Sequence, residues 1–189
     1  MRRFTVIIAA MAVMGMFAQE ALAQNPHLKG RTPVSFTDNG LTLSATVSYA
    51  GLGNFDTLQV LTATGGTTST CTNQGGNQAP GQNPAPVTVV GATPVPADDI
   101  KNGNVTISTT TAEPVSPVPG APGCPNPTWT EEITDVSFTS ATIRLFQDQT
   151  AADGEFGRWE TLVLTVSCTF DPATSDGAVP RSSFTCTTA

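Results

Sequence analysis

Side chains that commonly serve in catalysis or metal binding are scarce in this sequence of 189 residues. It contains one histidine and four cysteines, and 12% of its residues are charged. The sequence lacks a Gly-x-Ser-x-Gly motif, the nucleophile elbow of many serine hydrolases. It also lacks a Cys-x-x-Cys pair, which a redox dithiol or a zinc site would use. We therefore predict no catalytic centre and no bound metal or cofactor.

Positive charge is also scarce. The sequence has 8 Lys and Arg residues against 15 Asp and Glu residues, so its formal net charge at pH 7 is -7. Proteins that bind phosphate backbones or anionic lipid headgroups need a positively charged surface. We therefore expect no nucleic acid partner, and we predict an unidentified protein or glycan instead.

The main apolar run is too short to cross a membrane. It covers residues 4–18, whereas a membrane-spanning helix needs about 20 apolar residues. Arg2 and Arg3 precede the run, and Ala21-Leu22-Ala23 follows it with the small-x-small pattern that signal peptidase cleaves. We predict a signal peptide over residues 1–23 and a single domain over 24–189. The product is expected to be secreted, extracellular or periplasmic, without membrane insertion, and the form of the leader is typical of bacteria.

A helical pattern is missing as well, because no window has a sustained apolar stripe with a 3.6-residue period. Short alternating runs recur between clusters of Gly, Pro, Asn and Asp. This pattern predicts an all-β fold, an antiparallel β-sandwich that is immunoglobulin-like in the broad sense, with about seven to ten strands. The predicted strands are a hairpin over 34–47 and the segments 57–64, 87–93, 105–111, 129–138, 141–146, 158–170 and 182–187.

The first hairpin has a specific predicted register. Asn39-Gly40 is a dipeptide that favours the type I′ turn of two-residue hairpin loops. A turn there pairs Phe36 with Leu43 and Val34 with Ala45 on one face. Because local turn chemistry and face pattern agree, we expect this hairpin to form part of the sheet structure.

Three irregularities are predicted. Residues 73–86 contain nine Asn, Gly or Pro residues, and residues 114–127 contain six Pro, so both are expected to be long loops without strands. Between Ile133 and Val136 the apolar residues change parity. This change predicts either a β-bulge or a strand break near Thr134.

The four cysteines are expected to pair, as thiols of exported chains normally do. Three pairings are possible for four cysteines. A Cys168–Cys186 disulfide across the last predicted hairpin also places Phe170 opposite Phe184 on the inward face. Cys71–Cys124 then follows by elimination and joins the two long loops. Loop closure predicts stabilisation of about 3 kcal/mol for the shorter ring and about 4 kcal/mol for the longer.

The most specific candidate surface is aromatic. If strands 141–146 and 158–170 pair with Ile143 opposite Leu162, then Phe146 faces Trp159 on the outer side of the sheet. Outward Trp, Phe and Arg residues dominate binding hot spots, and aromatic rings stack on sugars. The plainer alternative is a cross-strand aromatic pair that only supports the sheet. The candidate ligand-binding residues are Arg144, Phe146, Trp159 and Thr161.

Other reactive groups have weaker support. Pro26 lies where an amino-terminal copper clamp ending at His27 would need a backbone nitrogen. Adjacent Glu131 and Glu132 point to opposite faces of a strand, so at most one can line a given site. The remaining candidates are the carboxylates of Glu155 and Glu160 and a possible calcium turn formed by Asp148 with Asp153-Gly154-Glu155.

The favoured function is a secreted, non-enzymatic structural or interaction protein of the extracellular space or cell surface. One alternative is a carbohydrate-binding, lectin-like module that uses the Trp/Phe patch. Another is a surface-fibre subunit, although residues 182–189 lack the aromatic that chaperone-assembled fimbrial subunits usually carry near the end. A hydrolase on a β scaffold is the third.

Overall fold

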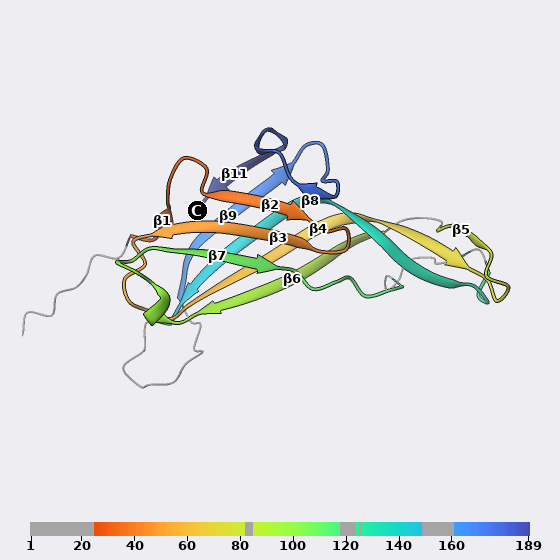
Figure 1. The fold of residues 1–189 in the computed structure, drawn as a ribbon, viewed down its shortest axis with the longest axis horizontal. Helices are drawn as coiled ribbons and strands as arrows, with labels where there is room; N and C mark the ends of the chain where they lie inside the picture. Colours follow the sequence, from red (N-terminus) through yellow and green to blue (C-terminus); the bar gives the residue numbers. More distant parts are fainter. Residues whose placement is uncertain (1–24, 82–84, 118–123, 125, 149–160) are drawn as a thin grey trace, which may run out of the picture.

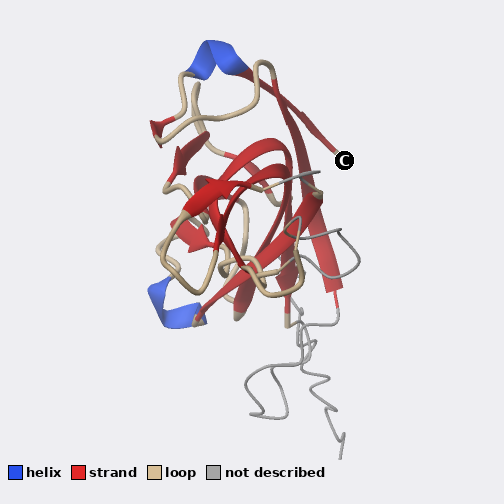
Figure 2. Ribbon diagram, turned by 90° about the vertical axis from the view of Figure 1, so that its right-hand side faces the viewer, coloured by secondary structure: helices blue, strands red, loops and turns tan. Residues whose placement is uncertain are grey.

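The chain folds into two antiparallel sheets that face each other across one core. The computed structural model describes residues 25–81, 85–117, 124, 126–148 and 161–189, so the predicted leader lies outside the described residues. Figure 1 shows the strands, and Figure 2 shows the short 3-10 helices of the described residues at opposite ends of the molecule. These helices are η1 (Ala97–Asp99) and η3 (Arg181–Ser183). The predicted all-β sandwich is confirmed.

Sheet A consists of β1 (His27–Leu28), β2 (Val34–Asp38), β3 (Leu43–Ala50), β7 (Val105–Thr110) and β10 (Gly177–Ala178). In it β3 lies between β7 on one side and β1 and β2 on the other, and β10 pairs with β2. Sheet B consists of β4 (Thr57–Thr72), β5 (Gln78–Pro80), β6 (Pro86–Val95), β8 (Thr130–Gln147), β9 (Thr161–Phe170) and β11 (Phe184–Thr188). Its strands follow the order β11-β9-β8-β4, and β4 pairs on its other side with β6 and β5.

Alternating apolar side chains from both sheets fill the space between them, as expected for half-buried strands. Phe36 of sheet A makes edge-to-face contacts with Phe170 and Phe184 of sheet B, at centroid distances of 5.0 and 5.1 Å. The core also holds a polar chain, in which the Tyr49 hydroxyl donates to Gln59 Oε1 at 2.6 Å. Burial raises the pKa of the Tyr49 hydroxyl well above its ordinary value.

The first hairpin has the predicted faces but a different register. Phe36 pairs with Ala45, and Asp38 pairs with Leu43, so the loop contains residues 39–42 rather than two residues. The predicted pairing of Phe36 with Leu43 is therefore wrong. A type I′ turn needs positive φ at both central residues, and here Gly40 has φ 80° while Asn39 is not among the described residues with positive φ. The shift is two residues, so the same side chains still face the core.

Strands β4 and β8 are longer than predicted and form an arm. Segments 129–138 and 141–146 belong to one strand, β8, which pairs with β4 from Thr57↔Gln147 to Thr72↔Thr130. Two register shifts leave Thr134 and Thr139 of β8 without a partner on β4. Of the two alternatives expected near Thr134, a β-bulge or a strand break, the structure shows the bulge. Figure 1 shows the distal part of this strand pair extending beyond the rest of the sandwich together with β5.

Both predicted disulfides are present, and Phe170 lies opposite Phe184 as expected. The prediction that residues 73–86 contain no strand is wrong, because β5 pairs with the tip of β4 and β6 begins at Pro86. The Asn73 side chain accepts hydrogen bonds from the backbone N–H groups of Gly75 and Asn77, which turns the chain back toward β4. The described part of residues 114–127 contains no strand.

The two sheets meet along one side of the sandwich, where β6 contacts β7. Ala112 N–H donates to the Val90 carbonyl at 2.9 Å, and the Thr93 hydroxyl donates to the Ser108 carbonyl at 3.1 Å. A Cβ atom on Gly91 would lie 2.0 Å from the Thr110 carbonyl oxygen. This position needs glycine because the two backbones approach so closely.

Candidate functional site

The register between β8 and β9 changes the predicted aromatic surface. Ile143 pairs with Val166 rather than Leu162, and Phe146 pairs with Leu162. The predicted pairing of Phe146 with Trp159 is therefore wrong, and Trp159 itself lies outside the described residues. Phe146 remains on the outer face of sheet B, with an aliphatic neighbour where an aromatic one was expected.

A β-bulge in β9 explains why Leu162 is on this face. Leu145 pairs with Leu164 and Phe146 with Leu162, so Val163 is the extra residue. An extra residue reverses the side-chain alternation beyond it. Leu162, expected to face the core, is instead turned outward and is 50% exposed. Thr161 pairs with Gln147, a buried residue, and so belongs to the side of the sheet opposite Phe146.

The outward side chains of sheet B form two zones. One zone is a row of hydroxyls that crosses five strands, formed by Thr88, Thr64, Ser140, Thr169 and Thr185. Near the other end of sheet B, several outward positions of β4, β6, β8 and β9 are apolar. Two of these side chains, Leu162 and Val90, are 50% and 48% exposed. We call this zone the apolar patch; its members are Leu58, Val60, Val90, Phe146 and Leu162.

Arg144 lies within this surface, as predicted for an outward residue of β8. Its neighbours across the sheet are Val60 on β4 and Thr165 on β9. The side chain is exposed, and within the described part of the chain no carboxylate pairs with it. An arginine beside aliphatic and aromatic side chains combines the residue types that contribute most to protein interfaces.

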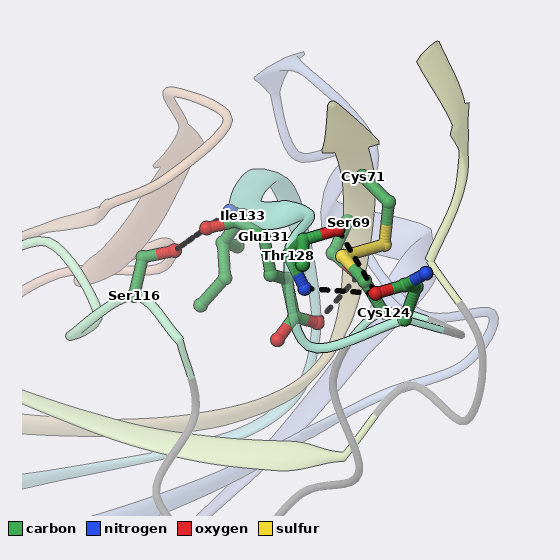
Figure 3. Close-up of a disulfide and its surroundings, with 8 residues drawn as sticks. Ser69, Cys71, Ser116, Cys124, Thr128, Glu131 and Ile133 are labelled. Atoms are coloured by element: carbon green, nitrogen blue, oxygen red, sulfur yellow. Dashed lines mark hydrogen bonds between the residues drawn. A yellow bond between two sulfur atoms is a disulfide. The ribbon is translucent and has the colours of Figure 1, made fainter. Parts of the chain in front are cut away.

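The two adjacent glutamates of the arm point to opposite faces, as predicted. Glu131 is half-buried and accepts a hydrogen bond from the Ser69 hydroxyl at 2.9 Å, whereas Glu132 is exposed. Figure 3 shows Glu131 beside the Cys71–Cys124 disulfide. The backbone N–H of Ile133 donates to the Ser116 hydroxyl at 3.1 Å. These contacts hold Glu131 within the arm. Glu132 lies on the opposite face, so the two carboxylates cannot act together as an acid–base pair.

The remaining candidates are not assembled into a site in the described chain. His27 is exposed, with Nδ1 2.6 Å from the Asn25 carbonyl oxygen. Asp148 is buried, while the other residues of the candidate calcium turn, and both Glu155 and Glu160, lie outside the described residues. Among residues that the structure describes, no three His, Cys, Asp or Glu side chains are grouped to hold a metal ion. No described helix is long and apolar enough to span a bilayer.

Three carboxylates, which the sequence pattern did not predict to meet, lie around Gly40. Asp38 is 2% exposed and accepts hydrogen bonds from Gly40 N–H, at 3.0 Å, and from the Thr174 hydroxyl. The carboxylates of Asp135 and Asp176 approach the same turn from β8 and from the segment before β10. Burial raises the pKa of Asp38 above its ordinary value, the two hydrogen bonds oppose this, and the neighbouring carboxylates add to the increase.

We expect Asp38→Asn to change how stability depends on pH. Because the pKa of Asp38 is raised on folding, protonation favours the folded state. This contribution increases as the pH falls through the folded pKa, and it is fully present below the ordinary value of 3.8. The free energy of unfolding of Asp38→Asn minus that of the native chain should therefore be greater at pH 7 than at pH 3.5. Urea unfolding at both pH values measures this difference. The exposed Asp99→Asn is the control, and an equal effect of Asp38→Asn at both pH values would contradict the argument.

Comparisons with protein-family models, curated proteins and solved structures find no match for this chain.

Proposed function

We propose that this chain is a secreted, non-enzymatic interaction protein that binds a protein partner through the apolar patch and Arg144. The observation that carries the proposal is the position of Leu162, which a bulge turns outward beside Phe146 and leaves half exposed. Contiguous apolar surface on a soluble domain often marks an interaction site.

The composition of the patch favours a protein over a glycan. Sugar rings stack on flat aromatic side chains, but in the described part of the patch Phe146 is flanked by Leu58 and Leu162, which are aliphatic. Protein interfaces typically have an apolar centre, a polar rim and an arginine or aromatic anchor. The apolar patch, the neighbouring hydroxyl row and Arg144 correspond to these parts.

The location of the patch on paired strands also supports binding. Its residues come from β4, β6, β8 and β9, which are neighbours in one hydrogen-bonded sheet. Side chains on a rigid sheet lose little conformational freedom when a partner binds. The two disulfides are consistent with a non-cytoplasmic compartment, since such bonds persist where the environment is oxidising.

The proposal can be tested by site-specific photocrosslinking. A photoreactive amino acid is placed at Leu162, and in the control at Ser108, an exposed residue on the outer face of sheet A. Both proteins are incubated with the envelope and medium proteins of the producing cells. We expect a discrete protein adduct from position 162 that is absent from position 108. Equal labelling from both positions would contradict the proposal.

The purified partner then allows a binding measurement. Leu162→Ser and Arg144→Glu should each weaken the affinity by about tenfold or more, as expected of hot-spot residues. Ser108→Arg should leave the affinity unchanged, and thermal unfolding verifies that each variant is folded. A glycan array provides the competing outcome. Glycan binding that is lost in both Phe146→Ala and Trp159→Ala would identify a carbohydrate-binding module instead.

A further inference from the structure

Most sheet edges are covered in the part of the chain that the structure describes. An open edge exposes backbone N–H and C=O groups that can pair with another chain. Along the arm, the Ser116 hydroxyl bonds to both the Glu131 carbonyl, at 3.3 Å, and the Ile133 N–H, at 3.1 Å (Figure 3). Farther along β8, Val136 N–H donates to the Gly40 carbonyl and Phe138 N–H to the Thr174 hydroxyl. Loops and side chains thus bind several outward backbone groups of this edge.

The other edges are also protected or very short. Strands β6 and β7, which end the two sheets on one side, contact each other directly through the hydrogen bonds of Val90 and Thr93. Strands β1 and β10 contain two residues each, and β5, at the other end of sheet B, contains three, one of which is a proline. Only a longer exposed strand can provide a continuous set of pairing groups.

Strand β11 differs from these edges. It has five residues and ends the order of sheet B beyond β9. Ala189 exchanges two backbone hydrogen bonds with Thr165, and the Ser183 carbonyl accepts from Asp171 N–H. Backbone N–H and C=O groups alternate in direction along a strand. In β11 the groups of the odd-numbered residues therefore point toward β9, and the groups of Cys186 and Thr188 point away from the sheet. In the described structure these outward groups have no hydrogen-bond partner.

The β11 edge lacks the features that usually prevent strand pairing. Its sequence contains no charged residue, proline or glycine, and its pairing with β9 shows no bulge. The Cys168–Cys186 disulfide and the packing of Phe184 against Phe36 hold the strand in place. Arg181 covers the Phe184 carbonyl, at 2.7 Å, which leaves the edge available from Cys186 onward.

We propose that β11 pairs antiparallel with β11 of a second copy of this chain about a twofold axis. In this arrangement Thr187 lies opposite its counterpart, and Cys186 and Thr188 exchange backbone hydrogen bonds with the same two residues of the second copy. Cross-strand threonine pairs stabilise sheets. The uncharged side chains of β11 also suit a second copy, because two chains of net charge -7 can approach there without opposing side-chain carboxylates.

This pairing closes on itself. An isologous contact uses the same surface on both copies and produces a dimer, not a fibre. The twofold axis of an antiparallel strand pair is perpendicular to the sheet, so both apolar patches would face the same side. The dimer does not depend on the proposed function of the patch, since its formation is measured without any ligand.

Sedimentation equilibrium of the purified protein, with both disulfides intact, tests the proposal over a range of concentrations. We expect a reversible monomer–dimer equilibrium. Thr188→Pro removes an outward N–H from each copy and thus half of the intermolecular hydrogen bonds, so the dimer should weaken by about tenfold. Thr187→Lys places like charges opposite each other and should also weaken it.

The matched control is Ser35→Lys, which adds the same charge to the outer face of sheet A and should dimerise as the native chain does. Thermal unfolding and the masses of disulfide-linked peptides establish that the variants are folded. A monomer at every concentration, unchanged dimers in both β11 variants, or open-ended polymers would each overturn the proposal.

Discussion

Phe36→Ala should lower the free energy of unfolding by about 3–5 kcal/mol, the usual cost of removing a large aromatic side chain from a core. Phe36 is 2% exposed and connects the sheets, because it contacts Phe170 of β9 and Phe184 of β11 from the opposite layer. Its loss leaves a cavity that two separate sheets would have to move to fill. Urea unfolding followed by circular dichroism measures the change.

Phe146→Ala is the matched control, since it removes the same side chain from the outer face of sheet B. We expect a loss of no more than about 1 kcal/mol there, as for other partly exposed positions. The comparison separates the two roles assigned to these phenylalanines. If Phe146→Ala proved as destabilising as Phe36→Ala, Phe146 would be a structural residue, and the case for a binding surface around it would fail.

Side-chain alternation was sufficient to predict which residues face the core in most strands. The face of Phe36 was predicted correctly even though its partner was not, because a shift of two residues preserves the face. The bulge at Thr134 was visible because Ile133 and Val136 differ in parity. Phe138 and Ala141 are both buried and also differ in parity. This pattern fits a second bulge at Thr139 and two separate strands equally well.

The candidate surface was only partly predictable. Alternation placed Arg144 and Phe146 outward, but the register with β9 depends on the bulge at Val163. The apolar run from Leu162 to Leu164 gives no indication of where its alternation changes. The carboxylates around Gly40 were also missed, because Asp38, Asp135 and Asp176 are far apart in the sequence and meet only in the folded chain. Tertiary contacts of this kind have no local sequence signal.

Replacing both Cys71 and Cys124 with alanine should reduce the free energy of unfolding by about 4 kcal/mol, as loop closure predicts for cysteines 53 residues apart. The Cys168/Cys186 double replacement should cost about 3 kcal/mol, because that pair closes a shorter loop of 18 residues. The difference in loop length therefore predicts the order of the two effects. Urea unfolding of both double variants measures it.

The location of the damage distinguishes the two disulfides further. Cys71 lies at the tip of β4, so the Cys71/Cys124 variant should lose amide protection first in the arm, at β5 and at Ile133, whose N–H depends on Ser116. The core strand β3 should keep its protection until global unfolding, since none of its contacts involves this disulfide. Hydrogen exchange measured by mass spectrometry resolves the two regions. Uniform loss of protection would mean that the arm and the sandwich unfold as one cooperative unit, and that the disulfide acts only through the unfolded chain.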